Sequence, residues 1–146
     1  MSIKLFLGVL NCRGSDCEST PYFTSYLILN YQSGSSAPTG SLYILREKVP
    51  AEVEEYLKTL NITIKGYDQV LGDVAALEGA VYIDKSIANH ALCNALKDKK
   101  SSVTSKPNII DKLKAVKNPI EIQGFTDCHV RDGAAVVRNL LSSNIL

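Results

Sequence analysis

Residues 112–135 read KLKAVKNPIEIQGFTDCHVRDGAA, and this stretch decides how the rest of the chain is interpreted. Pro119 disfavours helix at Asn118 and suits the first turn of a helix, where its missing N–H costs nothing. Asn118 can then cap the helix, and Glu121 occupies the third position of a capping box. The sequence therefore predicts a long helix that begins at Pro119 and runs close to Leu146.

One face of this predicted helix is apolar. The residues at helical spacing on this face are Ile122, Phe125, His129, Val136 and Leu140, whereas Arg131 and Arg138 lie elsewhere. An apolar stripe needs a surface to pack against, either on the preceding domain or on a further part of a longer protein. A single histidine on such a face is more often a packed side chain than a ligand.

The composition describes an ordinary globular protein. The chain has 146 residues, of which 45% are hydrophobic, and this suits one domain with a real core. A formal net charge of +1 gives no reason to expect nucleic acid or an anionic membrane as a partner. No apolar run approaches the roughly 20 residues of a membrane-spanning helix, and the apolar run near Met1 is too short for a signal peptide.

The four cysteines show neither zinc nor redox spacing. Free thiols without a secretory signal are typical of a reducing compartment, so we expect a cytoplasmic protein.

Before the long helix, the sequence predicts three strands in succession and then helices that alternate with strands. Strands are predicted over residues 5–10, 22–31 and 42–45, and we expect them to form an antiparallel meander. The later elements are a helix opened by Pro50, a strand at 62–65, a helix capped by Asp68, a strand at 80–83 and a helix capped by Ser86. Residues 98–105 read as a polar linker and residues 107–116 as a short helical connector.

This order of elements predicts an α/β fold of three layers, a mixed sheet flanked by helices. We expect one domain over residues 1–105, a connector over residues 106–117 and the long helix over residues 118–146.

The loop RGSD, residues 13–16, is the strongest candidate for a functional surface. It follows a predicted buried strand, and Gly14 permits tight backbone geometry. Arg13 and Asp16 carry opposite charges, so the physical interpretation is a turn with an ion pair. The candidate site residues are Arg13, Gly14, Ser15 and Asp16.

Two stretches resemble the Xaa-Pro aminopeptidases (aminopeptidase P) of the creatinase and prolidase superfamily. Residues 113–137, LKAVKNPIEIQGFTDCHVRDGAAVV, resemble the segment that enters the catalytic domain, approximately LKA-I/V-KN-P/S-x-E-x-x-G-M/F-x-x-A/C-H-x-R/K-D-x-A-A. Residues 9–29, VLNCRGSDCESTPYFTSYLIL, are similar to a run in the second N-terminal domain, approximately F-N-L-R-G-S-D-x-x-x-N-P-x-F-x-S-Y. In the second run, Cys12 replaces a leucine and Thr20 replaces an asparagine.

The resemblance implies a fold of the creatinase N-terminal type, related to the ribonuclease H-like motif. It implies a parent enzyme that removes an N-terminal residue preceding proline, with water activated between two divalent metals, manganese or zinc. Their ligands come from later segments resembling D-x-G, T-x-D-x-T-R-T, H-G-x-G-H, E-P-G and R-x-E, which are absent from this sequence. We therefore expect no cofactor in this chain and no peptidase activity from it alone.

The resemblance also gives residues 13–16 a role in walling the substrate cleft, where Arg13 could orient a substrate. The partners it implies are the catalytic domain of the same polypeptide and a peptide with proline second, and it admits a homodimer. Residues 118–146 would be the first helix of a truncated metallopeptidase catalytic domain. The alternative is a stand-alone interaction module, or an inactive truncated paralogue, that binds a partner through its last helix.

Overall fold

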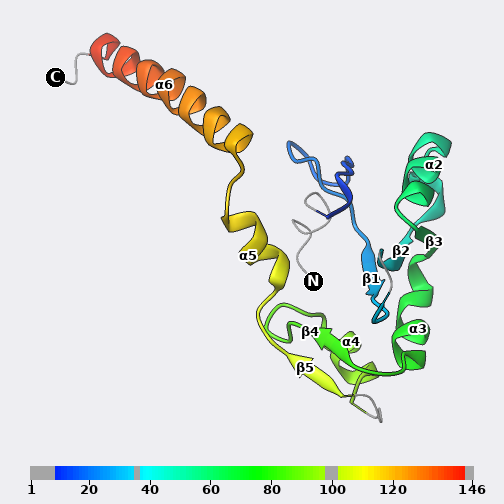
Figure 1. The fold of residues 1–146 in the computed structure, drawn as a ribbon. Helices are drawn as coiled ribbons and strands as arrows, with labels where there is room; N and C mark the ends of the chain where they lie inside the picture. Colours follow the sequence, from blue (N-terminus) through cyan, green and yellow to red (C-terminus); the bar gives the residue numbers. More distant parts are fainter. Residues whose placement is uncertain (1–8, 35–36, 98–101, 144–146) are drawn as a thin grey trace. The chain divides into compact units, whose positions relative to one another are not determined.

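The computed structural model describes residues 9–34, 37–97 and 102–143 (Figure 1). The chain forms two compact units, Met1–Ile110 and Asp111–Leu146. The first is a mixed α/β unit, and the second is helical. Within the described ranges, no helix combines the length and the apolarity that a membrane span requires.

A three-stranded mixed sheet forms the centre of the first unit. Strand β1 (Tyr26–Asn30) pairs antiparallel with β2 (Thr39–Ile44), and β2 pairs parallel with β3 (Ile62–Gly66). Helix α2 (Ala51–Thr59) makes the crossover that a parallel pair requires. A short 3₁₀ turn, η1 (Arg46–Lys48), precedes α2, and the helix begins after Pro50 as predicted.

Side chains of β2 alternate between two apolar cores, since successive residues of a strand face opposite sides of a sheet. Leu42 and Ile44 join one core, which includes Leu57 of α2 at 0% exposure. Tyr43 joins the other core with residues of α3 (Val70–Ala76) and α4 (His90–Ala95). Helices therefore cover both faces of a mixed sheet, which confirms the predicted layering.

A second sheet lies within the same unit. Strand β4 (Val81–Ile83) pairs parallel with β5 (Val103–Ser105), and the pair is separate from the three-stranded sheet in the described part of the chain. The predicted polar linker over residues 98–105 is therefore wrong at its C-terminal end. A three-residue strand is stabilised by its pairing with β4, and pairing of this kind leaves little local signal.

The predicted first strand, over residues 5–10, is not confirmed. Val9 and Leu10 are helical, and residues 5–8 lie outside the described residues. Of the predicted meander, the antiparallel β1–β2 pair is correct.

Two predicted helix caps are also wrong. Asp68 lies inside a 3₁₀ turn, η2 (Tyr67–Gln69), and it is the Gln69 side chain that accepts a hydrogen bond from the Gly66 N–H at 3.1 Å. Helix α4 is capped by Asn89, whose Oδ1 accepts the Ala91 N–H at 2.8 Å. Ser86 instead donates through its hydroxyl to Asp84 at 2.6 Å, so it is not available to the helix.

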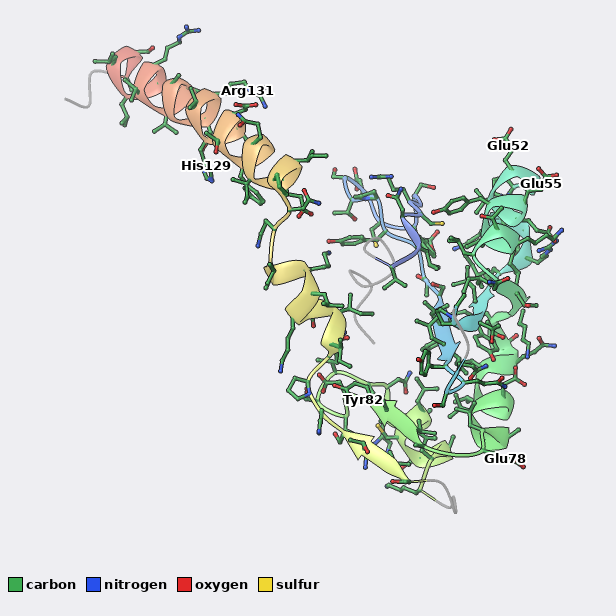
Figure 2. The ribbon with its side chains drawn as sticks, in the orientation of Figure 1. Glu52, Glu55, Glu78, Tyr82, His129 and Arg131 are labelled. Atoms are coloured by element: carbon green, nitrogen blue, oxygen red, sulfur yellow. The ribbon has the colours of Figure 1, made fainter. Side chains whose placement is uncertain are left out.

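Hydrogen bonds at the end of β4 fix the segment that precedes helix α5 (Ile109–Ala115). The Tyr82 hydroxyl donates to the carbonyl of Pro107, and Asp84 Oδ2 accepts the Asn108 N–H at 3.0 Å (Figure 2). Helix α5 confirms the predicted short connector helix.

Helix α6 (Pro119–Ser142) begins as the sequence predicts. Asn118 Oδ1 accepts the Glu121 N–H at 2.9 Å, and Glu121 Oε2 accepts the Asn118 N–H at 2.8 Å. None of its residues is buried in the described structure, and Phe125 is 54% exposed. The His129 ring is also exposed and stacks on Phe125 at 6.3 Å between centroids, while Arg131 lies on the opposite side of the helix (Figure 2).

Candidate functional site

The four predicted site residues line one pocket of about 480 Å³ in the first unit. The loop that carries them lies over the apolar core between β2 and α2. The pocket floor is apolar and is made by Phe23, Leu42, Ile44, Val49, Val53 and Leu57. The structure therefore places residues 13–16 at the mouth of a cavity and brings all four of them together.

Backbone hydrogen bonds hold this loop in a tight turn. The Gly14 N–H donates to the Pro21 carbonyl at 3.1 Å, and the Asp16 N–H donates to the Tyr22 carbonyl at 3.0 Å. A Cβ atom at Gly14 would lie 2.5 Å from the Phe23 Cβ, closer than van der Waals contact allows. Glycine is needed here because the loop backbone lies directly against the Phe23 side chain.

The ion pair of the loop differs from the expected one. Asp16 Oδ2 lies 2.8 Å from Lys48 Nζ, on η1, and also accepts the Thr24 N–H at 2.8 Å. The hydrogen bond from Lys48, followed by that from Thr24, lowers the pKa of the Asp16 carboxyl below its ordinary 3.8. Asp16 is therefore an ionised anchor of the loop, bound to Lys48 rather than to Arg13.

Arg13 is exposed at the pocket mouth. No ion pair found among the described residues includes it. The neighbouring Ser15 is also exposed and lines the same mouth. A guanidinium in this position can bind a carboxylate through two parallel hydrogen bonds.

Cys12 lines the pocket without the properties of a nucleophile. Burial raises the pKa of its thiol, so the protonated form persists, and its Sγ donates to the Leu10 carbonyl at 3.4 Å. The other three cysteines are free as well.

Sequence reasoning missed the pocket wall that η1 and the start of α2 provide. Lys48, Val49, Pro50 and Val53 all line the cavity. Of these residues only Pro50 carries a sequence signal, and that signal indicates the start of a helix. The contact between this segment and the RGSD loop is tertiary, so local sequence patterns do not predict it.

A second polar cluster lies on the other face of the sheet. Asp73 Oδ2 accepts the Tyr43 hydroxyl at 2.7 Å and lies 2.6 Å from Lys65 Nζ. Burial, and then the hydrogen bond to Asp73, raises the pKa of Tyr43 to about 12. These bonds join β2, β3 and α3, and they stabilise the fold rather than form an open site.

The described residues bring together no group of three or more histidine, cysteine, aspartate or glutamate side chains that could hold a metal ion. The described side chains therefore do not fit a dinuclear metal centre.

Residues 9–121 match the family model described as the creatinase/prolidase N-terminal domain. The chain belongs to this family. The predicted resemblance is thereby confirmed for the larger part of the sequence, including the RGSD loop and the start of α6.

Proteins similar to this member of the creatinase/prolidase N-terminal domain family are much longer. It is 35% identical, over 141 residues, to a probable Xaa-Pro aminopeptidase P of Pyrenophora teres f. teres, covering 88% of this chain and 20% of that protein. It is 30% identical, over 157 residues, to aminopeptidase P1 of Arabidopsis thaliana, covering 90% of this chain and 23% of that protein. The chain thus spans about a fifth of the length of these relatives.

A solved structure shows the same fold. The X-prolyl aminopeptidase of Caenorhabditis elegans, described as a cytosolic enzyme with a di-nuclear active site, matches with a TM-score of 0.77 at 24% identity. The match covers 97% of this chain and 23% of that one. This member of the family therefore has the creatinase N-terminal fold that its sequence predicts.

Proposed function

We propose that the chain is a non-catalytic domain of an aminopeptidase P-like metallopeptidase. The observation that carries the proposal is the family match over residues 9–121, together with relatives named Xaa-Pro aminopeptidase P that extend well beyond the matched region. The parent enzyme removes an N-terminal residue that precedes proline. The likeness to the ribonuclease H-like motif is part of the same proposal.

In this proposal α6 is the first helix of the catalytic domain, after a domain over residues 1–105 and a connector over residues 106–117. Two observations support it. The family match ends at residue 121, just after α6 begins at Pro119, and the apolar side chains of α6 are exposed in the described structure. Burial of such a face against a following domain would remove a large apolar area from water.

Residues 13–16 help to form the substrate cleft, and the domain also contributes to contacts between two subunits of a homodimer. The pocket mouth, with its exposed Arg13 and its anchored Asp16, supports the cleft role. The partners are then the catalytic domain and a peptide with proline second.

The two divalent metals, manganese or zinc, belong to the catalytic part of the parent enzyme. They would polarise the scissile carbonyl and supply hydroxide. Free cysteines and the cytosolic description of the nematode enzyme support a cytoplasmic location for the parent.

The test is the mass of the native product, by immunoblot with antibodies against this domain. A product several-fold larger than 15.9 kDa, which hydrolyses Xaa-Pro peptides after immunopurification, is expected. A product at 15.9 kDa, the mass of this chain, would overturn the proposal. The purified chain is expected to show no turnover with manganese or zinc, and turnover would contradict its non-catalytic role.

The exposed face of α6 favours a second candidate, a stand-alone interaction module or inactive paralogue that acts through this helix. Sedimentation of the purified chain separates the two. A dimer that Phe125→Ser dissociates, and that the off-stripe control Val130→Ser leaves intact, would favour the module. A monomer would favour the domain of a larger enzyme.

A further inference from the structure

We propose that the pocket below the RGSD loop binds the C-terminal residue of a short peptide. The apolar side chain of that residue enters the pocket, and its free α-carboxylate binds Arg13. The inference rests on the proposed function for the origin of the peptide, which is a substrate of the parent enzyme.

The cavity has an apolar lining and ample room for one apolar side chain. Its volume of about 480 Å³ lies in the range of ligand pockets, about 300–1,000 Å³. The floor is formed by aliphatic side chains and the ring of Phe23, and charged groups occur only at the mouth. A ligand must therefore place an apolar group inside and a polar group at the entrance.

The charges at the mouth specify the sign of that polar group. Three charged side chains line the pocket, namely Arg13, Asp16 and Lys48. Asp16 and Lys48 lie 2.8 Å apart and neutralise each other, and Asp16 is further engaged by the Thr24 N–H. Arg13 thus remains as one net positive charge, which favours a ligand with a single negative charge.

The hydrogen-bond donors at the mouth favour a carboxylate as that charge. The N–H groups of Gly14 and Asp16 already donate to loop carbonyls, so the backbone does not form an anion nest like those that bind phosphate. The Arg13 guanidinium and the adjacent Ser15 hydroxyl are donors at the entrance, next to the Lys48 ammonium group that is paired with Asp16. A planar carboxylate matches the fork of one guanidinium, and its single charge equals the one net positive charge at the mouth.

A C-terminal apolar residue meets both requirements within one amino acid. Its side chain and its carboxylate are attached to the same α-carbon, so one can enter the cavity while the other stays at the mouth. An internal residue or an amidated terminus offers the side chain without the charge. The site would therefore favour peptides with a free C-terminus.

The test compares the acid and amide forms of one peptide on the 146-residue chain. The probes are N-acetyl-alanyl-leucine and its C-terminal amide, titrated with calorimetry and with backbone amide NMR shifts. The acid is expected to bind at least about tenfold more tightly than the amide, as hydrogen bonds to a charged group predict. The largest shifts are expected at the loop and at the start of α2. N-acetyl-alanyl-glycine, which lacks the apolar side chain, is expected to bind about tenfold more weakly than the leucine acid.

Two variants assign the effect to Arg13. Arg13→Gln is expected to abolish the preference for the acid, and Arg131→Gln, the same change at an exposed arginine of α6, is expected to retain it. Equal binding of acid and amide, no binding of either, or a preference that survives Arg13→Gln would each overturn the proposal. The wild-type comparison alone decides the first two outcomes, so the test stands even if a variant fails to fold.

Failure here is distinguishable from failure of the proposed function. Acid-selective binding with a native product of 15.9 kDa would retain the pocket specificity and reject the parent enzyme. A larger Xaa-Pro peptidase whose domain shows no acid preference would do the reverse.

Discussion

The ammonium group of Lys48 lies 2.8 Å from the carboxylate of Asp16, and this contact fixes the RGSD loop to η1, the turn that precedes α2. The same carboxylate accepts the Thr24 N–H, so one side chain joins three segments of the pocket wall. The loop is thus held by an ion pair and a hydrogen bond to other segments of the chain. Arg13 projects from a fixed backbone at the mouth of the cavity.

Removing the charge of Asp16 is expected to loosen the loop. Asp16→Asn should lower the free energy of unfolding by about 1 kcal/mol, since it weakens a partly covered ion pair and a hydrogen bond to a charged acceptor. Urea denaturation followed by circular dichroism measures this change. Glu52→Gln on exposed α2 is the control and should stay close to the wild type. An equal effect of the two changes would contradict the anchoring role of Asp16.

Acid is expected to destabilise the fold through its paired carboxylates. Four carboxyl groups have lowered pKa values, those of Asp16, Glu54, Asp73 and Asp84, each because of hydrogen bonds to its ionised form. A lowered folded-state pKa gives stability that is complete above the ordinary value and is lost as the pH falls through the lowered value. The free energy of unfolding should therefore decrease from about pH 5 downward.

The same urea series at decreasing pH tests this prediction. Asp16→Asn should show a shallower decrease than the wild type, because one of the titrating groups is absent. A pH-independent free energy of unfolding across this range would show that these pairs make no net contribution.

Steric contact makes any side chain at Gly14 costly. Gly14→Ala would put a Cβ atom 2.5 Å from the Phe23 Cβ, so loop or ring must shift, at a cost of about 1–3 kcal/mol. Gly72→Ala in α3 is the matched control, because no atom beyond its chain neighbours and the backbone of its own helix lies within 4 Å of the added Cβ. The control should stabilise the chain by roughly 0.5–1 kcal/mol through helix propensity. Thermal unfolding of both variants gives the comparison, and two changes of the same sign would contradict it.

How well each element is predicted from the sequence depends on how far apart in the sequence its stabilising partners lie. The start of α6 is correct to the residue because the bonds between Asn118 and Glu121 are local and carry a known signature. The cap predicted for α4 is wrong because the helix begins only at His90, where Asn89 is the cap, whereas Ser86 lies before it with its hydroxyl bound to Asp84. Strand β5 is missed because its pairing with β4 involves a distant part of the chain.

The candidate site shows the same division. The RGSD motif identifies the loop, and the structure places all four of its residues at one pocket. The opposite charges of Arg13 and Asp16, three positions apart, predicted a local ion pair. In the structure Asp16 instead forms its ion pair with Lys48. The apolar floor could not be predicted, since Leu42 and Leu57 meet there only after the β2–α2–β3 crossover has formed.

The Tyr43 hydroxyl provides the last prediction, because its partner and its pKa are both defined. The Tyr43 hydroxyl donates to Asp73 Oδ2 at 2.7 Å, and Tyr43 is only 2% exposed. Its pKa is raised from 10.0 to about 12. Since the folded state holds this proton more strongly than the unfolded state, the stability it contributes is complete below pH 10 and is lost as the pH rises toward 12.

Tyr43→Phe should therefore lower the free energy of unfolding by about 1 kcal/mol at neutral pH, the typical net value of one hydrogen bond. It should also remove part of the tyrosinate absorbance that develops in the native protein only at the alkaline end of a titration. Tyr31→Phe is the control, because Tyr31 is 75% exposed. The pKa of Tyr67 is also raised to about 12, chiefly by its hydrogen bond with Tyr26, so part of the late absorbance is expected to stay in both variants. An undiminished late absorbance in Tyr43→Phe would show that Tyr43 does not carry a raised pKa. The bond between β2 and α3 would then not protect its proton.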